Sequence, residues 1–128
     1  MILVDTSVWI EGFRRAGSHE AEHLRILLDA DEVAMTPPVR IEILSGSSRA
    51  DFPQLCRTLS ALPLFTPSVE TWERIESWVE RAVRVGRHFG VADLQVAAVA
   101  AENELPIWSL DRDFAAMAKL GFIRVHNA

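Results

Sequence analysis

Hydrophobic residues along the chain alternate between short continuous runs and longer segments in which they recur every three or four positions. The short runs are typical of strands covered on both faces, and the periodic segments are typical of helices with one buried side. The strand candidates are 2–4, 33–35, 64–65, 106–108 and 122–125. The alternation predicts an α/β domain with a mostly parallel sheet.

Capping residues, prolines and glycines mark the expected helix boundaries. Thr6 or Ser7 can cap a first helix, and Gly46 suits the end of a helix that two prolines open. The other expected helices cover 20–29, 37–44, 52–62, a long segment from Ser68, 91–102, and a last segment from Asp111 or Arg112 to about Gly121. Trp72 and Trp78 have the spacing of buried helix residues, which favours the core over a base-stacking surface.

The composition is that of one globular domain. The chain has 128 residues, 49% apolar and 24% charged, so we expect a single domain over 1–128. No apolar run approaches the ~18 residues of a membrane span, and the N-terminus lacks the basic region of a signal peptide. Cys56 is the only cysteine. It cannot form an internal disulfide, which fits the reducing cytoplasm where we expect the protein.

The net charge of −5 at first argues against a nucleic-acid partner, because phosphate-binding proteins usually carry a basic face. The argument weakens if several acids form a metal site, since two divalent cations would bring −5 to −1. The distribution of charge, rather than its sum, therefore decides whether nucleic acid can bind.

Four acids are placed where the predicted framework would bring them together. Asp5 directly follows the first strand, and Asp111 follows the strand at 106–108. Ligands of open parallel sheets bind outside the carboxyl ends of the strands. Glu42 lies in an apolar helical turn, and Asp93 opens a helix rich in alanine and valine. Solvent exposure of Glu42 and helix capping or dipole stabilisation by Asp93 and Asp111 are the simpler alternatives.

Carboxylates packed together repel one another and would protonate unless cations neutralise them. Oxygen ligands without a cluster of cysteine or histidine select Mg²⁺ or Mn²⁺ over zinc. Magnesium held by few protein ligands also accepts phosphate oxygens, which is what phosphodiester cleavage requires. The four acids therefore predict a magnesium-dependent nuclease.

Four segments resemble the motifs of PIN-domain ribonucleases, and most closely the VapC-type toxins of bacterial toxin–antitoxin pairs. The segments are Val4-Asp5-Thr6-Ser7, Arg40-Ile41-Glu42-Ile43-Leu44 with Gly46, Val91-Ala92-Asp93-Leu94-Gln95-Val96-Ala97-Ala98, and Trp108-Ser109-Leu110-Asp111-Arg112-Asp113-Phe114. They occur in the family's order, and the resemblance spans the chain from Leu3 to Val125.

The resemblance implies a PIN-like three-layer α/β fold, with a parallel five-stranded sheet of order 3-2-1-4-5 flanked by helices. It implies endonucleolytic cleavage of RNA with Mg²⁺, for which Mn²⁺ can substitute. It also implies a cognate VapB-type antitoxin as inhibitor and a homodimer as the assembly.

Carried onto matching positions, the resemblance makes Asp5, Glu42 and Asp93 the core acids. Asp111 fits the fourth position because it lies nearer the strand end, and Asp113 competes for that position. Further roles are implied for three groups of residues: Thr6, Ser7 and Ser109 would orient Asp5 or a metal-bound water; Arg112, Arg14, Arg15 and Arg40 would hold RNA phosphates; Trp9 and Phe13 would contact the antitoxin.

The sequence also suggests three alternatives to a toxin nuclease. His19, Glu20 and His23 match the zinc-peptidase pattern H-E-x-x-H, but charged residues interrupt that helix and the peptidase leaves the other acids unexplained. A housekeeping PIN nuclease of RNA processing has the same site as a toxin. A catalytically silent PIN-like binding module is disfavoured because none of the acids is missing.

Overall fold

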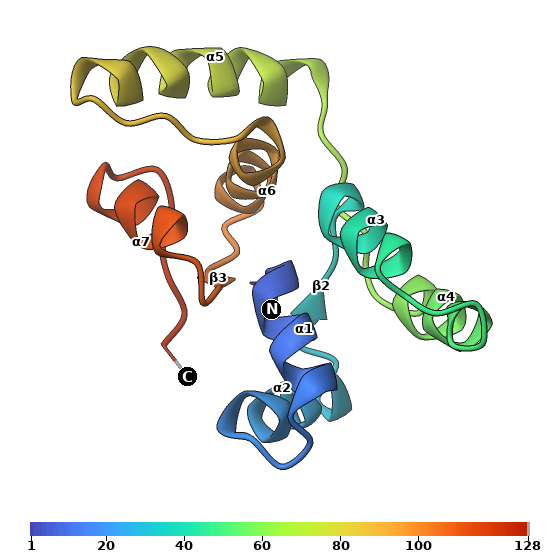
Figure 1. Cartoon of the computed structure of the whole chain (residues 1–128). Coiled ribbons are helices and arrows are strands. Elements are labelled where there is room, and N and C mark those ends of the chain that lie inside the picture. Colours follow the sequence, from blue (N-terminus) through green and yellow to red (C-terminus); the bar gives the residue numbers. More distant parts are fainter. Residues whose placement is uncertain (128) are drawn as a thin grey trace.

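The computed structural model of the chain describes residues 1–127, and strands alternate with helices as the hydrophobic pattern predicts (Figure 1). The elements are β1 (Ile2–Val4), α1 (Thr6–Arg14), α2 (His19–Asp29), β2 (Val33–Ala34), α3 (Pro37–Ser45), α4 (Phe52–Ser60), α5 (Val69–Arg84), α6 (Val91–Glu102), β3 (Ile107–Trp108) and α7 (Arg112–Lys119). None of the helices in 1–127 is long and apolar enough to span a bilayer.

The sheet is parallel and has the order β2-β1-β3. Leu3 of β1 lies opposite Ala34 of β2 and Ile107 of β3. Beyond these strands, single parallel bridges join Met35 to Leu64 and Ile107 to Val125. Numbered in chain order with the two bridged segments included, the five segments therefore lie in the order 3-2-1-4-5, as the resemblance implies.

The number of strands differs from the expected five. Within 1–127 only three segments form strands, and the segments 64–65 and 122–125 contribute one bridge each. Pro63 and Pro67 flank the first of these segments, and proline cannot donate to a sheet ladder. The flanking prolines limit the pairing of this first segment, and the segment 122–125, which has no proline, also pairs through one residue.

Helices cover both faces of this small sheet. In Figure 1, α5 and α6 lie on one side of it and α1 and α2 on the other, while α3 and α4 lie beside β2. Leu94 to Ala100 in α6 are all buried. Most of these buried side chains are alanine or valine, and the first turn of α6 carries Asp93.

Three local predictions were wrong. The first helix is capped by Asp5, whose side chain accepts from the backbone N–H of Ser7, rather than by Thr6 or Ser7 itself. Helix α4 ends at Ser60, short of the predicted position 62. Trp78 is 5% exposed and belongs to the core, whereas Trp72 is 45% exposed. Helical spacing alone did not distinguish the two rings, because α5 has a wide apolar face.

Candidate metal centre

Asp5 is held at the junction of β1 and α1 by groups from both ends of the chain. Its backbone N–H donates to the carbonyl oxygen of Trp108 at 2.9 Å, which places it beside the end of β3. Asp5 is only 6% exposed, and its Oδ2 accepts from the hydroxyls of Ser7 and Ser109, each at 2.8 Å. No donor within 1–127 reaches Oδ1, so this oxygen can accept a cation.

The same two hydroxyl groups fix the loop after β3. The Ser7 hydroxyl accepts from the backbone N–H of Leu110 at 3.0 Å, and the Ser109 hydroxyl accepts from the N–H of Asp111 at 3.0 Å. Each serine thus donates to a carboxylate and accepts from a backbone amide. The predicted role of Ser7 and Ser109 in orienting Asp5 agrees with this geometry, and both also position the chain that carries Asp111.

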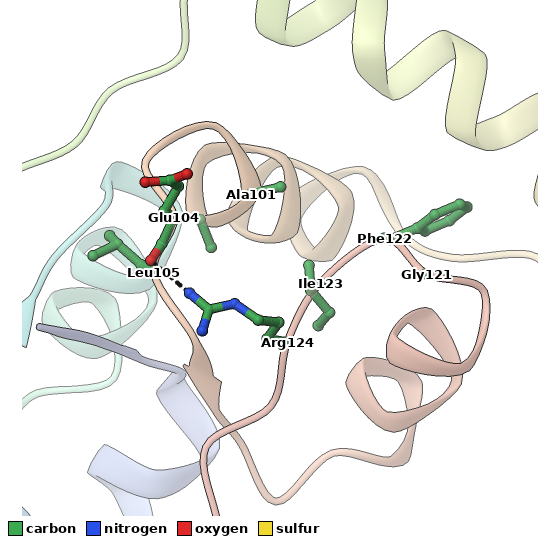
Figure 2. Close-up of a pocket in the computed structure, with 8 residues that line it drawn as sticks. Ala101, Glu104, Leu105, Gly121, Phe122, Ile123 and Arg124 are labelled. Atoms are coloured by element: carbon green, nitrogen blue, oxygen red, sulfur yellow. Dashed lines mark hydrogen bonds between the residues drawn. The ribbon is translucent and has the colours of Figure 1, made fainter.

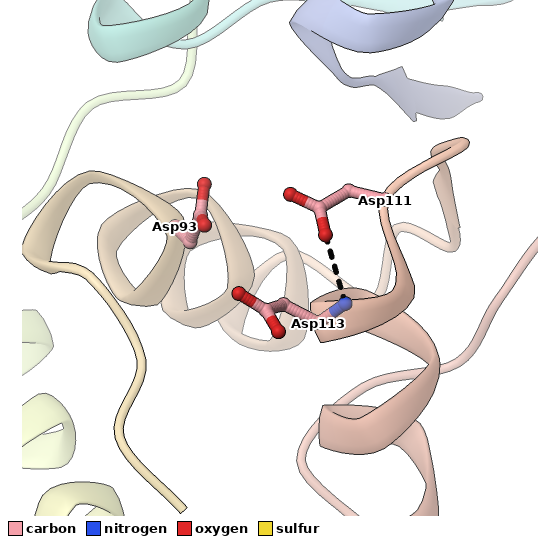
Figure 3. A group of neighbouring side chains, drawn as sticks. All are labelled: Asp93, Asp111 and Asp113. Carbon is pink, nitrogen blue, oxygen red and sulfur yellow. Dashed lines mark hydrogen bonds between the residues drawn. The ribbon is translucent and has the colours of Figure 1, made fainter.

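Asp93, Asp111 and Asp113 form a group in which one oxygen from each carboxylate lies within 4.8 Å of the others. Asp93 belongs to the first turn of α6, and the other two lie at the start of α7 (Figure 3). Asp111 caps α7, since its Oδ1 accepts from the backbone N–H of Asp113 at 2.9 Å. Where the sequence left a choice between Asp111 and Asp113, the structure brings both to Asp93.

The electrostatics of this group centre on Asp93. Burial is the largest cause of a rise in the pKa of Asp93 to about 6, and the charges of nearby carboxylates add to it. In decreasing order of effect, these carboxylates are Asp5, Asp111, Asp113 and Glu42. The other four acids are therefore close enough to Asp93 to repel its negative charge, and a bound cation would offset this repulsion.

Glu42 lies apart from this group, on an exposed part of α3. The Thr6 hydroxyl donates to its Oε1 at 3.3 Å. The predicted role of Thr6 towards Asp5 is therefore corrected, because among the residues 1–127 its hydroxyl bonds the carboxylate of Glu42. Ser7 and Ser109 hold one acid of the site, and Thr6 holds another.

The donor set fits a hard divalent cation. The converging ligand atoms are carboxylate oxygens, and within 1–127 no group of three histidine or cysteine ligands accompanies them. Oxygen ligands of this kind favour Mg²⁺ or Mn²⁺. The repulsion that raises the pKa of Asp93 is what a divalent ion would offset, so the residues present fit the expected metal.

A groove of about 600 Å³ runs from Glu42 between α1, α3 and α4. Its walls include the exposed side chain of Phe13, together with Ile10 and Arg14. The rest of the lining is Ile43, Gly46, Ser47, Ser48, Asp51, Gln54 and Leu55. Our prediction named Phe13 but missed the residues of α4, although the polar Gln54 and the hydrophobic Leu55 are visible in the sequence.

A second cavity, of about 490 Å³, lies at the C-terminal end of α6 (Figure 2). It is lined by Ala101, Leu105 and Phe122 among others, and the Arg124 guanidinium donates to the carbonyl oxygen of Glu104 at 2.9 Å beside it. Ala101, which lines this cavity, follows Asp93 by eight residues in α6. At a rise of about 1.5 Å per residue, the two positions are about 12 Å apart along the helix axis. It takes no part in the acidic site.

The predicted RNA-binding arginines differ in their surroundings. Arg40 donates to the Ser60 hydroxyl at 2.8 Å, and Arg15 pairs with Glu11 at 3.2 Å. Arg14 lines the groove beside Glu42, and Arg112 is exposed at the first position of α7. Arg112 is therefore the one nearest in sequence to the acids, with Asp111 and Asp113 on either side.

The H-E-x-x-H motif does not assemble a zinc site with Glu42. The His23 Nε2 lies 3.0 Å from Nε2 of His126, and the His23 ring packs edge-on against Trp108. The acid group described above is the one candidate metal cluster of three or more residues within 1–127. His126 was not singled out in the sequence, and no local pattern could have paired it with His23.

Comparison with known proteins shows the family to which this chain belongs. A family model of the PIN domain matches residues 2–120, which is most of the sequence. The chain therefore belongs to the PIN-domain family.

The individual relatives share one name. Ribonuclease VapC11 of Mycobacterium tuberculosis is 34% identical over 125 residues, which cover 94% of this chain and 93% of the relative. The structure of VapBC-5 from Mycobacterium tuberculosis, described as a member of the VapBC family of toxin–antitoxin systems, has 25% identity and a TM-score of 0.68 and covers 99% of this chain and 98% of that one. VapBC2 from Rickettsia felis, bound to a promoter DNA fragment, has a TM-score of 0.75 at 15% identity, with 100% of this chain and 99% of that chain covered. That last likeness concerns the fold alone.

Proposed function

We propose that this protein is a metal-dependent endoribonuclease that cuts RNA phosphodiester bonds as the toxin of a toxin–antitoxin pair. The observation that carries the proposal is the convergence of Asp93, Asp111 and Asp113 beside the buried carboxylate of Asp5. Membership of the PIN-domain family and the ribonuclease names of the relatives support it.

Asp5 and Asp93 would hold Mg²⁺, with Asp111 and Asp113 on the same side of the site and Glu42 acting at its border. The Oδ1 atom of Asp5 is suited to this role because Ser7 and Ser109 already occupy Oδ2. A bound Mg²⁺ supplies a Lewis acid for the phosphate oxygens and lowers the pKa of a coordinated water.

The chain itself supplies binding groups for the RNA backbone. Helices α6 and α7 both begin at the acid group, so the positive ends of two helix dipoles point at the place where a phosphate would bind. Gly90, at the start of α6, provides no side-chain cap, which leaves the first backbone N–H groups of α6 to a substrate or solvent. Arg112 would add a cation at the edge of the site.

The partner in this proposal is a VapB-type antitoxin whose inhibitory segment lies in the groove beside Glu42. Phe13 is 53% exposed there and offers an apolar surface. The walls are acidic on balance, because Glu42 and Asp51 outnumber Arg14. A segment with an apolar anchor and a basic side chain fits both features, and the neighbouring structure of VapBC-5 comes from a toxin–antitoxin system. Trp9, the other residue predicted to contact the antitoxin, is 2% exposed and is a core residue instead.

The partner is tested with Phe13→Ala. This variant should lose affinity for the co-expressed antitoxin while it retains RNA cleavage, because Phe13 is not among the acids. Equal antitoxin affinity in the variant and the wild type would contradict the placement. Sedimentation of the purified chain, with and without antitoxin, tests the homodimer that the family resemblance implies.

The nuclease itself is tested by sequencing RNA ends after induction of the wild type and of Asp93→Ala. We expect new 5′ ends and growth arrest with the wild type, and neither with Asp93→Ala or Asp5→Ala. Glu76→Ala, which removes an exposed acid of α5, is the matched control and should cut normally. Wild-type cleavage by Asp5→Ala would refute the site. Cleavage without growth arrest would favour a housekeeping nuclease over a toxin.

A further inference from the structure

A histidine pair outside the acidic site joins α2 to the C-terminal segment of the chain. The Nε2 atoms of His23 and His126 lie 3.0 Å apart, and the two rings are within 14° of parallel. Both rings are part-buried and lie edge-on to the indole of Trp108. This contact explains the conspicuous histidine of the H-E-x-x-H motif, which the nuclease site does not use.

The segment that carries His126 forms one edge of the sheet. The His126 backbone N–H donates to the carbonyl oxygen of Ile107 at 2.8 Å, and the Ile107 N–H donates to the carbonyl oxygen of Arg124 at 2.9 Å. Apart from the bridge between Ile107 and Val125, this edge has no ladder, so side-chain contacts must contribute much of its attachment. The His23 contact is one of them.

Two imidazoles can share such a hydrogen bond only while at least one ring is neutral. In that state one Nε2 carries a proton and donates, and the other Nε2 accepts with its lone pair. When both rings are protonated, both Nε2 atoms carry protons, the acceptor is lost, and two positive charges face each other across the former bond. The contact then changes from attractive to repulsive.

The surroundings provide little to compensate the second charge. On α2 the nearest titratable ring is that of His19, which is itself a histidine, 6.1 Å from His23 between centroids. From β3 the neighbour is the uncharged Trp108. On the C-terminal segment Arg124 is also cationic, and its guanidinium is bonded to the carbonyl oxygen of Glu104. Burial and the charge of His23 both lower the pKa of His126 below its ordinary value of 6.5.

We propose that His23 and His126 form a proton-operated latch. It holds the segment 124–126 against α2 and β3 while at least one of the two rings is neutral, and it releases the segment when both rings are charged. The latch does not require the chain to be a nuclease. The segment 124–126 pairs with β3, and β3 leads directly into Ser109. Release of the segment would therefore loosen one side of the strand that positions the loop of the acidic site.

Amide hydrogen exchange on the whole metal-free protein tests the latch. As the pH is lowered, release requires the pair to bind the proton that makes both rings charged. In this range we expect the protection of the His126 and Ile107 amides, corrected for intrinsic exchange, to fall about tenfold for each unit by which the pH is lowered. Core amides of α6, such as that of Ala98, should keep their protection over the same range, because the release is local. A parallel loss at Ala98 would mean global unfolding and would overturn the proposal.

The matched variants are His126→Gln, His23→Gln and His88→Gln. Glutamine can still form hydrogen bonds but does not titrate, so the first two should abolish the pH dependence at Ile107. His88 is exposed in the loop before α6 and serves as the control, which should retain the wild-type pH dependence. Persistence of the pH dependence in His126→Gln, or its loss in His88→Gln, would overturn the latch.

Titration of the histidine ring protons by NMR gives a second test that needs no variant. The latch predicts that the pair takes up its protons in two separate steps and that the pKa of His126 lies below its ordinary value, because the last proton enters against a charge already present. A titration of His126 at its ordinary value, in one step and independent of the other ring, would refute it.

Discussion

The hydroxyl group of Ser109 donates a 2.8 Å hydrogen bond to Oδ2 of Asp5, although the two residues are 104 positions apart in the sequence. The bond joins the loop after β3 to the end of β1, which are neighbouring strands of the sheet. Among residues 1–127 the donors to this carboxylate all bond Oδ2, which leaves Oδ1 without a hydrogen-bond donor. The geometry of the site thus depends on an uncharged residue as well as on its carboxylates.

Replacing Ser109 with alanine should weaken Mg²⁺ binding and RNA cleavage by about 10- to 100-fold, the usual effect of removing a group that orients a metal ligand. Asp5 would lose one of two hydroxyl donors, and the N–H of Asp111 would lose its acceptor. Calorimetric Mg²⁺ titration and cleavage rates measure the two effects.

Ser77→Ala is the matched control for this prediction, because Ser77 is exposed on α5 and remote from the acids. The double variant Ser7→Ala with Ser109→Ala should cost less than the two single effects added together, since both hydroxyls hold the same oxygen. Strict additivity would show that the serines act separately.

The stability of the metal-free protein should decrease as the pH rises from about 4 to about 6. Asp93 has a pKa of about 6 in the folded protein, above the ordinary value of 3.8, so in this range the folded state holds a proton that the unfolded chain has lost. Above pH 6 this contribution should level off. Denaturant unfolding at a series of pH values measures it as the difference between wild type and Asp93→Asn.

Mg²⁺ should show the opposite dependence on pH. Because the cation binds the deprotonated carboxylate, the rise in Tm caused by a fixed Mg²⁺ concentration should grow between pH 5 and pH 7. Asp93→Asn should abolish most of that rise, whereas Glu76→Gln should leave it intact. An equal Mg²⁺ effect at both pH values would argue against Asp93 as a ligand.

Asp111 and Asp113 can be separated because only Asp111 caps a helix. Asp111→Ala should lower the free energy of unfolding by about 1 kcal/mol, whereas Asp111→Asn should nearly preserve it, since asparagine is as good a cap as aspartate. Asp113→Asn should leave the cap unchanged. If both residues bind the metal, all three variants should weaken Mg²⁺ binding, and unaltered affinity in one of them would exclude that residue.

Thr6→Val should reduce cleavage through Glu42 while it leaves Mg²⁺ affinity nearly unchanged. The substitution keeps the shape of the side chain and removes the hydroxyl that donates to Oε1 of Glu42 at 3.3 Å. We expect a loss in kcat smaller than that of Glu42→Gln, and little further loss when the two are combined. Thr58→Val, at an exposed position of α4, controls for the added methyl group. A loss in the double variant equal to the two single losses added would show that Thr6 does not act through Glu42.

The sequence by itself determined the elements and the candidate acids. Hydrophobic spacing located the three strands and seven helices that residues 1–127 form, and the boundaries of α6 match the prediction at both ends. The start of α5 after Ser68 and the prolines at the start of α3 are local signals of the same kind. Such features can be predicted because they depend on residues within a few positions of one another.

Only the tertiary structure decided which partners those residues meet. It brought Asp113 to Asp93 together with Asp111, gave the Thr6 hydroxyl to Glu42 rather than to Asp5, and reduced both outer strands to single bridges. It also paired His23 with His126, which are 103 positions apart. These contacts depend on the paths of loops and on the packing of helices against a short sheet, and periodicity along the chain carries no information about either.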